Sequence, residues 1–113
     1  MARGKKTETT EVNYIEIDVK GAHDNNFEGR VYKEPHVVNG KGSWHGVSLT
    51  VNGVTIKGVK LWIPVDEKKA VCFLWPSYED KDKNRESYIA FFDKDDREDV
   101  ANLAEKLATD LGY

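Results

Sequence analysis

The feature that most constrains the fold of this chain is an Asn-Gly pair between two β-prone runs. Asn52-Gly53 separates residues 47–51 (VSLTV) from residues 54–56 (VTI). Both Asn and Gly tolerate the positive φ of a two-residue type I′ turn, and that turn matches the twist of paired antiparallel strands. The sequence therefore predicts a β-hairpin centred on this pair.

The second strand of the hairpin continues to about residue 63. Because side chains alternate along a strand, Val59, Leu61 and Ile63 share one face, and Lys60 and Trp62 share the other. A glycine inside a strand often marks a bulge, and we expect Gly58 to do so. One face of this strand is thus apolar, and the other presents a lysine beside a tryptophan.

Similar patterns elsewhere predict the remaining elements. Residues 14–20 alternate apolar and polar side chains, and residues 27–32, 70–75 and 87–92 are rich in β-prone types. Residues 33–43 contain Pro35 and a Gly-rich cluster, which indicates a loop or the tip of an irregular hairpin. Residues 1–11 contain no large apolar side chain after Met1, so we expect a flexible N-terminal arm followed by one domain over 12–113.

The C-terminal segment has helical periodicity. Asp93 is a typical N-cap residue, and acidic side chains in the first turn suit the helix dipole. Gly112 is a typical stop signal. The fold class predicted is α+β, an antiparallel sheet of five or six strands with one C-terminal amphipathic helix on one face. The apolar stripe of this helix comprises Val100, Leu103, Ala104, Leu107, Ala108 and Leu111.

Composition excludes several classes of protein. The chain has 113 residues and a formal net charge of -3, with no apolar run near the roughly 20 residues of a membrane span. The N-terminal residues lack the apolar core of a signal peptide, so we expect a soluble, cytoplasmic protein. Cys72 is the single cysteine, which leaves no internal disulfide and no cysteine-based zinc site.

Catalytic and metal chemistry receives little support. His23, His36 and His45 fall in three expected loops at spacings that match no zinc pattern. Cys72 lies between Val71 and Phe73, where a cysteine usually acts as a small apolar side chain. We therefore expect a protein that is not an enzyme and that uses no cofactor and no metal.

The face of the sheet opposite the helix is the expected binding surface. We expect it to carry Lys60 and Trp62, with either Phe73 and Trp75 or Cys72 and Leu74 on the next strand. Trp44 and Tyr78 are expected in adjoining loops. Aromatic side chains beside lysines on a sheet are how proteins stack unpaired bases. The alternative is that these aromatics form a core or a dimer seam, because an uncovered apolar sheet face commonly dimerises.

The second half of the chain resembles a known family. The resemblance covers about residues 45–110 and rests on the run 48–61 (SLTVNGVTIKGVKL), on 71–77 (VCFLWPS), on Tyr88-Ile89-Ala90 and on the helix that follows. It is to the septation regulators typified by stage V sporulation protein G (SpoVG-like proteins). Members of that family are small cytoplasmic sheet proteins with a C-terminal helix that dimerise and bind DNA or RNA, which implies a homodimer and nucleic-acid binding here.

The chain departs from the family pattern in three places. Tyr78-Glu79 stands where the family tends to carry a basic pair, Phe91-Phe92 replaces its usual His-Pro, and residues 21–44 add a segment. These departures are typical of a distant relative, such as one from a phage or mobile element. Phosphate contacts carried over from the family would fall on Lys81, Lys83 and Arg85, in a loop that also holds four acidic residues.

Two functions follow as hypotheses. The first is a regulatory nucleic-acid-binding protein that prefers single-stranded DNA or RNA, because stacking aromatics with scattered lysines suit unpaired bases and an acidic pI of about 5.6 argues against tight duplex wrapping. The second is a protein-interaction module that modulates a host protein through its open sheet face. The candidate binding residues are Trp62, Lys60, Trp75, Phe73, Trp44, Tyr78, Lys81, Lys83 and Arg85.

Overall fold

The computed structural model describes residues 13–79, 85–87 and 92–113, so the predicted N-terminal arm lies outside the described residues. It consists of a six-stranded antiparallel sheet and one helix, which confirms the predicted α+β class. The strands of the sheet are β2 (Tyr14–Lys20), β3 (Asn26–Tyr32), β4 (His36–Val38), β5 (Gly42–Val51), β6 (Val54–Pro64) and β7 (Cys72–Leu74). A second, two-stranded sheet pairs β8 (Ser77–Glu79) with β9 (Arg85–Ser87), and the helix α1 spans Lys94–Asp110.

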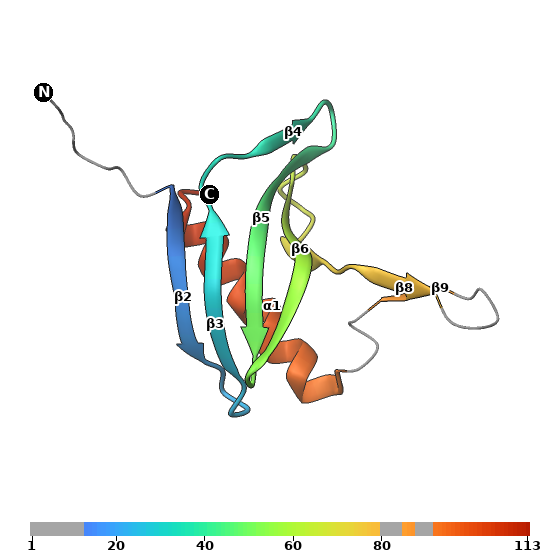
Figure 1. Ribbon diagram of the computed structural model, residues 1–113. Coiled ribbons are helices and arrows are strands. Elements are labelled where there is room, and N and C mark those ends of the chain that lie inside the picture. Colours follow the sequence, from blue (N-terminus) through green and yellow to red (C-terminus); the bar gives the residue numbers. More distant parts are fainter. Residues whose placement is uncertain (1–12, 80–84, 88–91) are drawn as a thin grey trace, which may run out of the picture.

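The sheet has the order β2-β3-β5-β6-β7, and β4 pairs with the first residues of β5. In Figure 1, α1 crosses behind the strands and covers one face, while the face toward the viewer carries no helix or strand. The β8–β9 hairpin projects from the side of the sheet near β6. We call the face that α1 covers the covered face and the opposite one the open face.

The central hairpin forms as the Asn-Gly pair predicts. Asn52 has φ 50° and Gly53 has φ 86°, the left-handed conformation that a type I′ turn needs at both positions. The register of β5 and β6 shifts between Val47 and Leu49, opposite Gly58 with φ 82°. The predicted bulge is therefore confirmed, and it keeps the apolar residues of β6 on the covered face on both sides of the irregularity.

Of the two alternatives for segment 33–43, a loop or the tip of an irregular hairpin, the hairpin is confirmed. His36–Val38 form β4, which pairs antiparallel with Gly42–Trp44 at the start of β5. The expectation that Trp44 and His45 lie in loops is wrong, because this pairing extends β5 back to Gly42. The predicted strand over 70–75 is shorter, at Cys72–Leu74, and most of the one over 87–92 falls outside the described residues.

The core lies between the covered face and α1. Alternate residues of the strands point inward, among them Val31, Leu49 and Leu61, whose side chains are 0% exposed. The helix contributes the apolar stripe predicted from its periodicity, and Leu111 packs against the edge of the same cluster. Asp93 is the N-cap and forms a capping box with Asp96, as its position at the helix start predicts. The buried helix residues of the core are Val100, Leu103, Ala104, Leu107 and Ala108.

Candidate nucleic-acid interface

Two rows of side chains cross the open face at right angles to its strands. The first row follows the pairing of His36 with Trp44, of Trp44 with Trp62, and of Trp62 with Cys72. In the second row, Tyr14 pairs with Tyr32, and Lys60 pairs with Gly46 and with Leu74. The Tyr32 ring lies close to Gly46 and so connects the two parts of this row. We call these two rows, together with Arg30, the aromatic platform.

Trp44 is enclosed within this platform. The His36 ring stacks on it with 4.0 Å between ring centroids and 7° between ring planes. The Lys60 Nζ atom lies 4.4 Å from the Trp44 ring centroid. Because the imidazole occupies one side of the indole, we place the lysine over the other, where the ring quadrupole attracts a cation. Trp44 therefore orients both His36 and Lys60.

Trp62 differs from Trp44 in being available. It is partly exposed, and no other described residue stacks on it or places a cation over it. It lies between Trp44 on β5 and Cys72 on β7, and two residues from Lys60 along β6. An aromatic ring that is held in a row, with a cation nearby and no ring upon it, can stack an incoming base.

A second cation–aromatic pair lies at the β2–β3 end of the platform. The Arg30 guanidinium is 4.4 Å from the Tyr14 ring centroid. Tyr14 and Tyr32 meet edge to face, with 6.2 Å between centroids and 73° between planes. The platform thus offers two cations, Arg30 and Lys60, each held against an aromatic ring.

The open face changes character toward the β2–β3 turn. Beyond Arg30, the pairing brings Asp18 opposite Glu28, and Glu16 lies opposite Arg30. Thr50 and Thr55 continue this half of the face, and their hydroxyl groups hydrogen-bond at 2.9 Å. Carboxylates repel anions, so this half of the open face is acidic, in contrast to the aromatic platform.

The structure brings three of the predicted site residues together. Trp62, Lys60 and Trp44 all lie on the open face, and Trp44 reaches it from β5 rather than from a loop. Phe73 and Trp75 do not join them. Phe73 pairs with Leu61, is 6% exposed and belongs to the core, and the expectation that these two aromatics lie on the open face is wrong.

Trp75 follows Phe73 on the covered side. Its ring lies 5.6 Å from that of Phe73 and 5.3 Å from that of Phe92, so it closes the core beside the helix start. Residues 71–75 are all apolar, so the sequence pattern does not determine which of them face the core and which face outward. Pairing with β6 selects the one that places Cys72 and Leu74 on the open face.

Tyr78 lies in β8 and Arg85 in β9, so the expectation that Tyr78 lies in a loop is wrong. Tyr78 pairs with Glu86, and Arg85 pairs with Glu79, which fixes their positions along the two strands. Lys81 and Lys83 lie outside the described residues. The phosphate contacts expected from the family resemblance at these positions stay predictions.

Sequence reasoning missed four members of the platform. Tyr14 and Tyr32 lie on the same side of their strands as the polar residues. Because Ile15, Ile17 and Val19 alternate with polar side chains, extending that alternation by one residue would have assigned Tyr14 to the open face. Arg30 shares that face through its pairing with Glu16. His36 carries no local signal, because only the pairing of β4 with β5 brings it to Trp44.

A cavity of about 340 Å³ lies beside Trp62. Trp62 and Pro64 line it from β6, Lys41 from the β4–β5 turn, and Asp66 and Lys69 from the β6–β7 turn. Its lining includes one aromatic residue and two lysines. A larger and more apolar cavity, of about 580 Å³, is lined by residues that include Val37, Val65 and Tyr113.

His45 has a structural role inside β5. It is 1% exposed, and its Nδ1 lies 2.8 Å from the Tyr32 carbonyl oxygen. A carbonyl oxygen only accepts, so Nδ1 donates, and in the neutral ring Nε2 accepts from the Tyr113 hydroxyl at 2.8 Å. His45 therefore ties the end of the chain and β3 to β5 and is satisfied within the fold.

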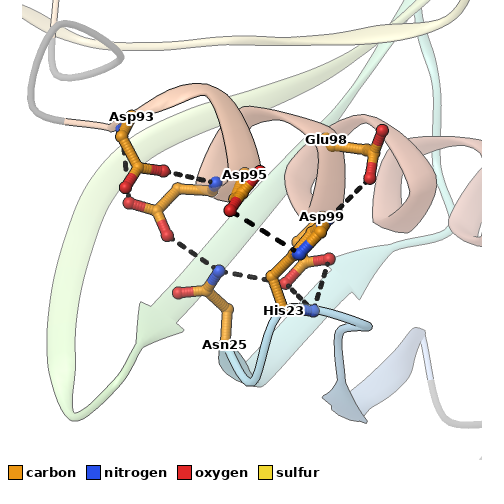
Figure 2. A network of polar contacts seen from close by, with 7 residues as sticks. His23, Asn25, Asp93, Asp95, Glu98 and Asp99 are labelled. Atoms are coloured by element: carbon orange, nitrogen blue, oxygen red, sulfur yellow. Dashed lines mark hydrogen bonds and ion pairs between the residues drawn. The ribbon is translucent and has the colours of Figure 1, made fainter.

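A polar network joins the β2–β3 turn to the first turns of α1 (Figure 2). Asp99 is 2% exposed and accepts from the His23 backbone N–H at 3.0 Å and from Asn25 Nδ2 at 3.0 Å. Burial by itself would raise the pKa of Asp99, but these hydrogen bonds outweigh it and hold the pKa below its ordinary value. A Cβ at Gly21 would collide with this carboxyl group, so the turn needs glycine there.

His23 forms the exposed edge of this network. Its Nε2 lies 2.6 Å from Glu98 Oε1, and that hydrogen bond, helped by the charge of Asp95, raises the pKa of His23 above 6.5. Within the described ranges, no group of three His, Cys, Asp or Glu side chains has an arrangement that could hold a metal ion. We interpret the network as a tie between the helix and the sheet.

Cys72 is exposed on the open face beside Trp62. Partial burial raises the pKa of its thiol above the ordinary value, which lowers the fraction of the reactive thiolate at neutral pH. Its position therefore gives no sign of an activated nucleophile.

The chain matches no protein-family model, and neither the curated proteins nor the solved structures yielded a match. Among the described residues, α1 is the one helix, and it is too short and too polar to cross a bilayer.

Proposed function

We propose that this protein binds single-stranded nucleic acid, DNA or RNA, through the aromatic platform on the open face of its sheet. The observation that carries the proposal is the alignment of Trp62, Trp44 and Lys60 in adjacent positions of two neighbouring strands. Base–aromatic stacking contributes about 1–3 kcal/mol per base and tolerates any sequence, because every base has a π-face.

Single strands fit this surface better than a duplex. The platform lies on the face of a sheet, and α1 lies against the opposite face, so the helix does not project from the platform into a major groove. Its cations are few, and the neighbouring acidic half of the face would repel a wider polyanion. The resemblance of residues 45–110 to septation regulators, which bind DNA or RNA, adds support.

The test is a fluorescence anisotropy titration with labelled 12-nucleotide DNA and RNA strands and with the matching duplexes. We expect the wild-type protein to bind the single strands at low salt and at tens of micromolar protein, and to bind the duplexes more weakly. Absence of binding to both single strands would contradict the proposal.

The variant Trp62→Ala tests the surface. We expect it to weaken single-strand binding by about 1–3 kcal/mol, roughly 5- to 150-fold. Val54→Ala is the control, because Val54 is another exposed apolar residue of β6 (66% exposed) at the far end of the strand. Equal losses in the two variants would show that the platform does not carry the binding.

The alternative function is a protein-interaction module. The apolar cavity beside Val37, Val65 and Tyr113 favours it, because these three side chains are more than half exposed and gather at one end of the sheet. Crosslinking of the purified protein in cell extract, with Val37→Asp/Val65→Asp as the comparison, tests this function. Loss of a crosslinked partner in the double variant, with strand binding absent in the wild type, would favour the module.

A homodimer formed through the open face would compete with nucleic acid for Trp62. We propose that the free chain dimerises there and that a bound strand separates the subunits. Light scattering of the protein with and without a 12-mer tests this: we expect twice the 12.9 kDa chain mass without the strand. A mass of one chain at micromolar concentration would contradict the dimer and leave the platform free.

A further inference from the structure

The cavity beside Trp62 lies outside the two rows and involves residues with no role in the proposed function so far. Lys41 lies in the β4–β5 turn and Lys69 in the β6–β7 turn, more than twenty residues apart in sequence. The tertiary fold brings both to the same cavity beside Trp62.

The two turns that form its walls are held by backbone hydrogen bonds. The Val65 N–H donates to the Lys41 carbonyl at 2.9 Å and so joins one turn to the other. The Lys69 N–H donates to the Asp66 carbonyl at 3.0 Å, and the Lys68 N–H donates to Asp66 Oδ1 at 2.9 Å. The walls are therefore shaped before any ligand arrives, which lowers the entropic cost of binding.

The charges of the cavity favour an anion. Lys41 and Lys69 contribute two positive charges, and neither ammonium forms an ion pair with a carboxylate in the part of the chain that the structure describes. Asp66 contributes one negative charge, but one of its oxygens already accepts the Lys68 N–H within the turn. The lining is thus net positive beside an aromatic surface.

Size and lining together select the ligand. A volume of about 340 Å³ is at the small end of ligand cavities, which run from roughly 300 to 1,000 Å³. It can hold one nucleotide, with the base against Trp62 and the phosphate between the two lysines. We infer that this cavity receives one unstacked nucleotide of the bound strand, with Trp62 against its base and Lys41 and Lys69 on its phosphate. This inference rests on the proposed function.

The first experiment observes Trp62 directly. The chain has three tryptophans, so protein labelled with 5-fluorotryptophan gives three fluorine resonances, and Trp62→Phe identifies the one from Trp62. On adding a (dT)12 strand, we expect the Trp62 resonance to shift and that of Trp75, which packs against the core on the covered side, to stay in place. Strand binding with an unmoved Trp62 resonance would overturn the inference.

The second experiment measures the lysines. For single strands, each phosphate contact contributes about 0.7 to the slope of log affinity against log salt. We expect Lys41→Ala/Lys69→Ala to lower the magnitude of the slope by about 1.4 and to weaken binding at low salt about tenfold or more. The matched control is Lys33→Ala/Lys68→Ala, which removes the same charge from two lysines that do not line the cavity.

The two proposals fail in different ways. If wild-type protein binds no single strand, both fail. If wild-type protein binds but the two double variants have equal slopes, the inference alone fails. A free nucleotide could supply the same chemistry, so thymidine 5′-monophosphate is titrated in parallel: we expect it to bind far more weakly than the strand, and equal affinity would overturn the assignment to a strand.

Discussion

The two faces of the sheet use the same kinds of side chain for opposite purposes. On the covered face, Phe73 and Trp75 pack against the core beside α1. On the open face, Trp44 and Trp62 stand in a row with Lys60 and His36. Phe73 of β7 lies inward and Trp62 of β6 lies outward, although the two strands are neighbours. The face of the strand on which an aromatic residue lies, rather than its residue type, decides whether it stabilises the fold or is available for binding.

The largest expected effect separates the two faces by stability. Phe73→Ala should lower the free energy of unfolding by about 3–5 kcal/mol, because it leaves a cavity in the core. Trp62→Ala should lower it by less than about 1 kcal/mol in the monomer, since the Trp62 side chain is partly exposed and lies beside Trp44 on the open face. Urea unfolding, at a protein concentration where light scattering gives the mass of one chain, measures both, and equal losses would mean that Trp62 is a structural residue of the fold.

The next effect concerns the tie between the helix and the sheet. Asp99→Ala should cost about 1–3 kcal/mol, because the His23 N–H and the Asn25 amide lose a buried acceptor. Binding of a single strand by the folded variant should equal that of the wild type, since Asp99 lies on the covered side. A variant that folds normally but binds weakly would show that the two faces are coupled.

The stability that Asp99 contributes should depend on pH in the acid range, because the pKa of Asp99 is lowered in the folded state. A carboxyl group whose pKa is lower in the folded state stabilises the fold at pH values above its ordinary pKa of 3.8. This stabilisation is lost as the pH falls through the pKa of the folded state. The difference in stability between wild type and Asp99→Asn should therefore be largest near neutral pH and should shrink below about pH 3.8. Melting curves over the acid range measure it, and a constant difference would contradict the role of the charge.

His23 should have the opposite pH dependence. Its pKa is raised in the folded state, so its stabilisation is complete below 6.5 and is lost as the pH rises through the folded pKa. We expect His23→Gln to destabilise the protein more at pH 5.5 than at pH 9, by a small amount because the ring is at the surface. Melting temperatures at the two pH values measure this, with His36→Gln as the control. A loss of stability that is the same at both pH values would mean that His23 acts through packing rather than through its charge.

The smallest effect is electrostatic and belongs to the open face. Lys60→Ala should lower the magnitude of the salt slope of single-strand binding by about 0.7, the contribution of one phosphate contact. Stability should hardly change, because Lys60 is exposed on the strand. Titrations at two salt concentrations measure the slope. An unchanged slope would mean that Lys60 acts only by holding the Trp44 ring.

Local sequence was sufficient for the elements whose signal is contained in a few residues. The Asn52-Gly53 turn, the bulge at Gly58, the Asp93 cap and the apolar stripe of α1 each follow from backbone preferences or from a single periodicity. The same alternation put Lys60 and Trp62 on one face of β6 and Leu61 on the other. These features need no knowledge of which segments meet.

Tertiary pairing decided the rest. Residues 71–75 are apolar on both faces of the strand. Only the pairing of Leu61 with Phe73 therefore places Phe73 in the core and Cys72 on the open face. Lys41 and Lys69 line one cavity because two turns distant in sequence come together, and no local preference encodes that proximity. The physical reason is that a strand has two faces of equal backbone energy, and burial against the helix chooses between them only when the whole sheet has formed.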